Sequence, residues 1–218
     1  MLCIDQIQCI SLYPERFRRL QRVFPRLQLA AGVRPCEMLA AERRWFSEAM
    51  LRVRPGHCGA AVAHMRAWAR AGRGVTVVLE DDADVRSTDL EEHVYRVTAR
   101  DPEWDVLLFG FAADAALHPA CRMNDAERVS NRSIARVHWF TGMWAYALRR
   151  GRLTRRPARF DHTLEQQLCE MQPPLRVYGC VPNVVLHPGR YRLTAWGVEH
   201  CGRGAVEKSD TATTTGIA

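Results

Sequence analysis

Short apolar runs alternate with segments of helical periodicity along this chain. The run Val75–Leu79 (VTVVL) is apolar almost throughout and rich in β-branched residues, which predicts a strand covered on both faces. Ile7–Leu12 and Asp105–Gly110 (DVLLFG) predict two more buried strands. In Pro14–Leu27 the apolar residues recur at helical spacing with arginines on the other face, which predicts a helix.

The rest of the chain continues the alternation. Further helices are expected over Glu42–Leu51, Gly59–Ala71, Leu90–Ala99 and Leu164–Met171, an aromatic-rich strand and turn over Val137–Leu148, and one or two strands over Leu175–Val185. Strands alternating with helices indicate an α/β fold with a mostly parallel central sheet flanked by helices. Ligands of such sheets bind at the carboxyl ends of the strands.

Length and composition favour one compact domain. The chain has 218 residues, of which 47% are hydrophobic and 25% are charged, and these values exclude wholesale disorder. We expect a single domain over residues 1–200 and a flexible tail over 201–218, where the sequence is small and polar. No apolar run approaches the roughly 20 residues of a membrane span, and the first residues do not resemble a secretory signal. We therefore expect no transmembrane segment and a cytoplasmic location.

The basic side of the composition is almost all arginine. Lys plus Arg is 31 against 24 for Asp plus Glu, a formal net charge of +7, and Lys208 is the one lysine. Arginine suits planar contacts with phosphate. A nucleic-acid-binding protein more often concentrates its basic residues in a stripe interleaved with aromatics, whereas here they are spread along the chain. We therefore expect no nucleic-acid partner.

The eight cysteines form no Cys-x-x-Cys pair, so the zinc-ribbon pattern is absent. We expect free thiols in a reducing compartment, with a structural disulfide left open.

An acidic cluster follows the best strand directly. Glu80, Asp81, Asp82 and Asp84 come immediately after VTVVL. Their mutual repulsion favours binding of a divalent cation, and oxygen ligands suit Mg²⁺ or Mn²⁺. In an extended chain Glu80, Asp82 and Asp84 project to one side and Asp81 to the other, so one face is suited to a metal that binds a diphosphate. The alternative is a solvated acidic turn that caps the following helix.

The segment containing this cluster resembles a known family. GHCGAAVAHMRAWARAGRGVTVVLEDDADV is similar to the signature block of glycosyltransferase family 25, which includes bacterial lipooligosaccharide galactosyltransferases and collagen galactosyltransferases. The matching residues are Gly59, His64, Trp68, Gly74, Leu79, Glu80, Asp81 and Asp82. Ala60 and Ala63 stand where the family usually has Cys and Ser.

Other segments resemble the family in the same order, over roughly residues 7 to 188. CISLYPERFRRL is similar to its N-terminal segment, with Ser11 at the usual Asn and Arg16 retained. WDVLLFG resembles the strand that follows the acidic motif, and FTGMWAYALRRG resembles a later Thr-Gly-x-x-x-Tyr block that ends at Tyr146. RFDHTLEQQL supplies an acidic residue at Asp161, and VYGCVPNVVLHP resembles the closing segment.

The resemblance implies a GT-A-type nucleotide-sugar-binding fold and a metal-dependent, inverting transfer of galactose or glucose from a UDP-sugar to a glycan or glycoprotein acceptor. The metal, Mn²⁺ or Mg²⁺, neutralises a diphosphate leaving group, and a carboxylate base deprotonates the acceptor. The candidate metal ligands are Asp82, Asp84 and His187. The candidates for donor binding or its support are Ser11, Arg16, His64, Glu80 and Asp81. The candidate base is Asp161, with Glu165 as its substitute one turn later.

Each residue also has a purely structural interpretation. His187 precedes a proline and is suited to a loop, His64 to packing on a helix, Arg16 to the surface, and Asp161 to capping the following helix. Two other functions stay open: a catalytically degenerate member that binds a nucleotide-sugar, and an arginine-rich nucleic-acid-binding protein. Mn²⁺-dependent UDP binding would favour the enzyme. Oligonucleotide binding that depends steeply on salt would favour the nucleic-acid-binding protein.

Overall fold

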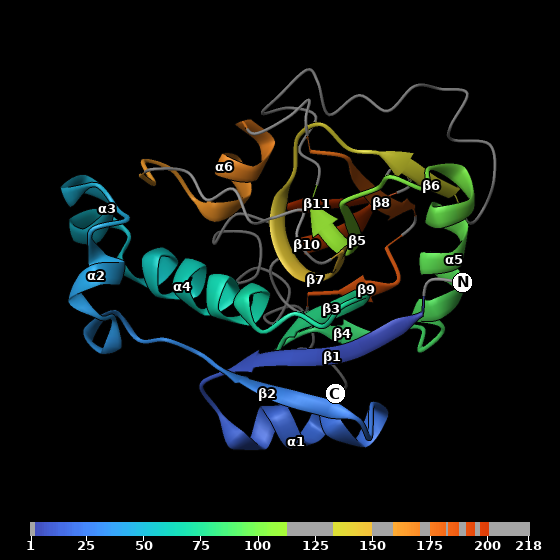
Figure 1. Ribbon diagram of the computed structural model, residues 1–218, viewed down its shortest axis with the longest axis horizontal. Helices are drawn as coiled ribbons and strands as arrows, with labels where there is room; N and C mark the ends of the chain where they lie inside the picture. The colour runs from blue at the N-terminus through green and yellow to red at the C-terminus, as the bar shows by residue number, and fades with distance from the viewer. Residues whose placement is uncertain are drawn as a thin grey trace, which may run out of the picture.

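The computed structural model describes residues 3–112, 133–149, 159–170, 175–181, 183–187, 191–194 and 197–200, the last two ranges as backbone. A mixed sheet of seven strands lies between helices on its two faces (Figure 1). In spatial order the strands are β2 (Leu27–Ala31), β1 (Ile4–Ser11), β3 (Val75–Glu80), β7 (Thr141–Arg149), β5 (Val106–Ala112), β8 (Val177–Val181) and β6 (Ser133–Arg136).

The fold is α/β, as the sequence predicts, but the central sheet is less parallel than expected. β2, β1 and β3 are parallel neighbours, as are β5 and β8. β7 lies between β3 and β5 and runs antiparallel to both, so the strands on either side of it share one direction. β6 runs antiparallel to β8 at the edge. Strands of one direction therefore dominate, but the sheet is mixed.

The helices cover both faces of the sheet. Their bounds are α1 (Pro14–Val23), η1 (Pro35–Glu37, a 3₁₀ turn), α2 (Ala40–Arg43), α3 (Glu48–Val53), α4 (Pro55–Ala69), α5 (Leu90–Arg100) and α6 (Leu164–Glu170). Val75, Val77 and Leu79 of β3 pack in one core with α1 and α5, whereas Val78 packs in the other with α4 and α6. The structure confirms the prediction that VTVVL forms a strand covered on both faces, since its residues are fully buried.

Two short antiparallel pairs complete the described structure. β4 (Asp84–Val85) pairs with β9 (Val185–Leu186), and β10 (Tyr191–Thr194) pairs with β11 (Gly197–His200). The sequence pattern predicts none of β2, β4, β10 or β11 as separate strands. The partners of β2 and β4 lie outside the local windows in which hydrophobic periodicity can be detected, whereas β10 and β11 form a local hairpin of short strands that the pattern does not indicate.

Two predicted helices are wrong in extent. α1 ends at Val23 rather than Leu27, because Phe24 precedes Pro25 and adopts an extended conformation, and Leu27 already begins β2. The helix expected over Glu42–Leu51 is two short helices. Ser47 breaks it by capping α3, accepting a hydrogen bond from the Met50 N–H at 3.3 Å.

The predicted tail 201–218 lies outside the described residues. The six cysteines of the described part of the chain are free thiols. No helix among the described residues is long and apolar enough to cross a membrane.

Candidate functional site

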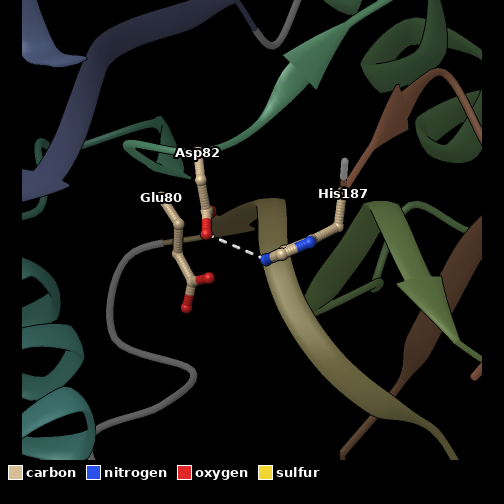
Figure 2. Close-up of side chains that lie close together, drawn as sticks. All are labelled: Glu80, Asp82 and His187. Atoms are coloured by element: carbon tan, nitrogen blue, oxygen red, sulfur yellow. Dashed lines mark ion pairs between the residues drawn. The ribbon is translucent and has the colours of Figure 1, made fainter. Parts of the chain in front are cut away.

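Three side chains of the acidic region and its surroundings meet at the carboxyl end of β3. Glu80 is the last residue of β3, Asp82 lies in the turn that follows, and His187 comes directly after β9. The pairing of β4 with β9, in which Asp84 stands opposite Leu186, brings these two distant parts of the chain together. Ligand atoms of Glu80, Asp82 and His187 all lie within 4.8 Å of one another. Figure 2 shows the two carboxylates side by side, with the imidazole of His187 directed toward them and paired with Asp82.

His187 is held in place from two directions. Its Nε2 lies 2.9 Å from Oδ2 of Asp82, and its ring packs edge-on against Trp144, with centroids 5.7 Å apart. The Trp144 indole N–H donates to the main-chain oxygen of Val185 at 3.0 Å, which fixes β9 against β7. A side chain at Gly110 would place its Cβ 2.1 Å from that indole nitrogen. Glycine in β5 is therefore what lets Trp144 hold β9.

This set of donors suits a divalent cation. Carboxylate oxygens are good ligands for Mg²⁺ and Mn²⁺. An imidazole nitrogen is a better ligand for Mn²⁺ and other first-row transition metals than for Mg²⁺. Two carboxylates this close together also repel each other unless a positive charge lies between them. Cys9 is a poor additional ligand, because burial, reinforced by the charges of Asp81 and Asp82, raises the pKa of its thiol to about 12.

Asp84, a predicted metal ligand, does not belong to this cluster. The chain turns after Glu80, with the Ala83 N–H donating to the Glu80 main-chain oxygen at 3.1 Å, so the extended alternation expected from the sequence stops there. Asp84 lies on β4 and pairs with Arg86 at 2.6 Å. Glu80, expected beside the metal ligands, takes the place in the cluster that the sequence gives to Asp84.

Asp81 faces the segment between β1 and α1. The Ser11 hydroxyl donates to Oδ2 of Asp81 at 2.7 Å, and Arg16 lies 3.4 Å from Oδ1. Arg19 donates to the main-chain oxygens of Asp81 and Ala83. Ser11, Arg16 and Asp81 therefore form one group that ties the N-terminal loop to the acidic turn. The sequence interpretation does not include Arg19.

His64 lies on α4 behind Glu80. Its Nε2 is 3.2 Å from Oε1 of Glu80, and its Nδ1 is 2.8 Å from the Tyr146 hydroxyl. The Trp68 indole N–H donates to the same hydroxyl at 2.6 Å. Burial raises the pKa of Tyr146 well above its ordinary value, so the phenol keeps its proton. The hydroxyl of a tyrosine inside an otherwise apolar strand needs a buried hydrogen-bond partner. The position of Tyr146 in the sequence therefore already indicated a polar contact here.

A cavity of about 180 Å³ lies beside the acidic turn. Its lining is acidic or polar at one end and small or apolar elsewhere, and consists of Ile10, Ser11, Leu12, Tyr13, Gly32, Val33, Gly56, Ala60, Ala63, His64, Glu80, Asp81 and Asp82. Small-molecule sites usually measure about 300–1,000 Å³, so this cavity has room for only part of a typical small-molecule ligand. Ala60 and Ala63 contribute only methyl groups to this lining.

The two candidate bases have different surroundings. Asp161 is exposed, and the described residues give it no hydrogen bond or ion pair. It does not cap α6 either, because Thr163 holds that position and exchanges hydrogen bonds with Gln166. Glu165 is half-buried on α6, whose Leu164 and Leu168 pack in the same core as Tyr146. Burial is the main cause of the raised pKa of Tyr146, and the charge of Glu165 adds a smaller contribution.

Comparison with known proteins adds little beyond the fold. No protein-family model and no curated protein matches the chain. Among solved structures, one described as the crystal structure of A197 from STIV is similar with a TM-score of 0.48 and 10% sequence identity, over 91% of this chain and 96% of that one. A likeness at this level identifies neither a family nor an activity.

Proposed function

We propose that this protein is a metal-dependent, inverting glycosyltransferase of GT-A type that moves galactose or glucose from a UDP-sugar to a glycan or glycoprotein acceptor. The observation that carries the proposal is the meeting of Glu80, Asp82 and His187 within 4.8 Å at the carboxyl end of β3. This edge of the sheet is where α/β folds bind ligands. The order of the sequence segments that resemble glycosyltransferase family 25 supports it as well.

A bound Mn²⁺ or Mg²⁺ would supply the positive charge that a departing diphosphate requires. Arg16 would assist as a planar donor to phosphate, because its guanidinium is half exposed and lies 4.8 Å from the centre of the Tyr13 ring. Tyr13 and the methyl groups of Ala60 and Ala63 line the neighbouring cavity with surface suited to a flat base. The cavity has room for one such portion of the donor.

The acceptor hydroxyl must lose its proton as the new bond forms, and a carboxylate within hydrogen-bond reach is the usual base. We propose Glu165 for this role, with Asp161 as the second candidate. Glu165 is half-buried on α6, which packs in the core that contains Tyr146, whereas Asp161 is exposed.

The decisive experiment measures UDP binding by calorimetry with Mn²⁺ and with a chelator. We expect binding only with Mn²⁺, and its loss in Asp82→Asn. Asp89→Asn is the matched control, because Asp89 is exposed and its side chain does not cap α5. Equal UDP affinity in the presence of chelator would contradict the proposal.

A screen of UDP-sugars for Mn²⁺-dependent hydrolysis and transfer then separates the remaining alternatives. Turnover of a UDP-hexose supports the enzyme. Metal-dependent UDP binding without turnover of any donor supports the catalytically degenerate member. Oligonucleotide binding that weakens steeply with salt, together with no UDP binding, supports the nucleic-acid-binding protein.

A further inference from the structure

A chain of hydrogen bonds, buried at its centre and partly buried at its two ends, runs behind Glu80 from one layer of the fold to the next. It begins at Trp68 on α4, passes through the hydroxyl of Tyr146 on β7 and the ring of His64, and ends at Oε1 of Glu80. The successive distances are 2.6, 2.8 and 3.2 Å. Tyr146 is completely buried and His64 is 4% exposed, so these groups depend on one another for hydrogen bonds.

The chemistry of the groups fixes the direction of this chain. The indole of Trp68 can only donate, so the Tyr146 oxygen accepts from it. The phenol has one hydrogen, and Nδ1 of His64 is the acceptor within reach among the described residues. A neutral imidazole whose Nδ1 accepts carries its proton on Nε2. That nitrogen faces the Glu80 carboxylate and donates to it.

The opposite tautomer is unfavourable at both ends. With the proton on Nδ1, the lone pair of Nε2 would face the carboxylate oxygen of Glu80 at 3.2 Å. The phenol hydrogen of Tyr146 would then lack an acceptor in a buried position, which is unfavourable.

We propose that Tyr146 is a positioning residue: its hydroxyl fixes the tautomer of His64 that donates to Oε1 of Glu80 and so leaves the other carboxylate oxygen to bind the cation. The part of this inference that concerns the cation rests on the proposed function. The hydrogen-bond direction does not. A residue that contacts a metal ligand directly, here His64, orients the ligand and contributes about 10–100-fold to metal affinity, and Tyr146 acts through it.

The first test observes the ring nitrogens of His64 by ¹⁵N NMR of the wild-type protein, with the signals assigned by comparison with His64→Gln. We expect a protonated Nε2 and an unprotonated Nδ1 at neutral pH. A proton on Nδ1, alone or together with one on Nε2, would overturn the proposal. The measurement needs neither metal nor substrate, so its outcome is independent of the proposed function.

The second test titrates Mn²⁺ into Tyr146→Phe and follows binding by electron paramagnetic resonance. We expect a mixture of His64 tautomers and an affinity below wild type by up to about 10–100-fold, the effect of losing a direct partner of the ligand. Tyr178→Phe is the matched control, since it removes a hydroxyl that donates to Asp101 at 2.9 Å in the core on the other face of the sheet. Trp68→Phe keeps the hydroxyl of Tyr146 and should bind Mn²⁺ within a few-fold of wild type.

Wild-type Mn²⁺ affinity in a folded Tyr146→Phe, or equal losses in all three variants, would refute the positioning role. Should Tyr146→Phe not fold, the wild-type nitrogen spectra still decide the direction of the chain. A wild type that binds no Mn²⁺ overturns the cation role of Glu80 and the proposed function together, while the tautomer result stands.

Discussion

At the scale of single residues, four neighbouring carboxylates have separate partners. Glu80 accepts from His64, Asp81 from Ser11, Asp82 contacts His187, and Asp84 pairs with Arg86. These partners offset part of the repulsion within the run of acidic residues, and the close approach of Glu80 and Asp82 leaves repulsion that a bound cation would relieve. Adjacent carboxylates therefore have different roles: Asp81 contacts the N-terminal loop, whereas Glu80 and Asp82 face His187.

The two candidate bases make a prediction at this scale. Glu165→Gln should lower the transfer rate about 10²–10⁴-fold with UDP affinity unchanged, because it removes a proton acceptor and leaves the donor site intact. Asp161→Asn removes only an exposed carboxylate, so its transfer rate should stay within a few-fold of wild type. Transfer kinetics and UDP calorimetry on both variants check this. A dead Asp161→Asn beside an active Glu165→Gln would return the role to Asp161.

At the scale of elements, α4 is the helix on which the site depends. It carries His64, and Gly59 allows it to approach the segment after β2, where a Cβ would lie 2.3 Å from the Val33 oxygen. A two-point contact joins it to α2: Arg66 donates from Nε and from one terminal nitrogen to the two carboxylate oxygens of Glu42, both at 2.8 Å. This ion pair therefore helps to hold the wall of the cavity.

Glu42→Gln should destabilise the fold by about 1–2 kcal/mol, since Arg66 is a third exposed and solvent screens part of the interaction. The hydrogen bond from Arg66 lowers the pKa of Glu42 below 4.5. The contribution is therefore complete above pH 4.5 and is lost as the pH falls through the folded-state pKa. Urea unfolding at neutral pH and below pH 4 measures it, and the gap between wild type and variant should narrow in acid. Glu37→Gln, from an exposed pair, is the control. A constant gap would contradict the assignment.

At the scale of the whole molecule, the site exists because distant strands dock side by side. His187 reaches Asp82 only after β9 has paired with β4 and been fixed to β7 through Trp144. The space for that indole is provided by Gly110 on β5. The candidate metal cluster thus depends on packing among four strands, although its ligands come from only two short stretches of sequence.

Gly110→Ala tests this dependence. The added methyl would lie 2.1 Å from the Trp144 nitrogen and 2.3 Å from the Val185 oxygen, so β9 must shift and carry His187 with it. We expect a loss of about 1–3 kcal/mol or more in the free energy of unfolding and weaker Mn²⁺ binding. Gly56→Ala is the control, because its Cβ would meet nothing within 4 Å. Thermal unfolding and Mn²⁺ titration measure the two effects. Unchanged Mn²⁺ affinity in a folded Gly110→Ala would show that the position of His187 does not depend on this packing.

The sequence by itself determined the features that depend on local pattern. The buried VTVVL strand, the helices α4, α5 and α6 and the strand β5 follow from periodicity within a few residues, and their ends are shifted by only a few positions. The acidic cluster could be located because it interrupts an apolar run at the strand's carboxyl end. The end of α1 could also have been predicted, since Pro25 excludes a continuing helix.

Only the tertiary structure decided the rest. The antiparallel insertion of β7 between β3 and β5 and the selection of Glu80 over Asp84 for the cluster both depend on how distant segments pair. Strand register and packing across about 100 residues of chain set these arrangements, and local hydrophobic pattern does not encode which of several compatible strands become neighbours.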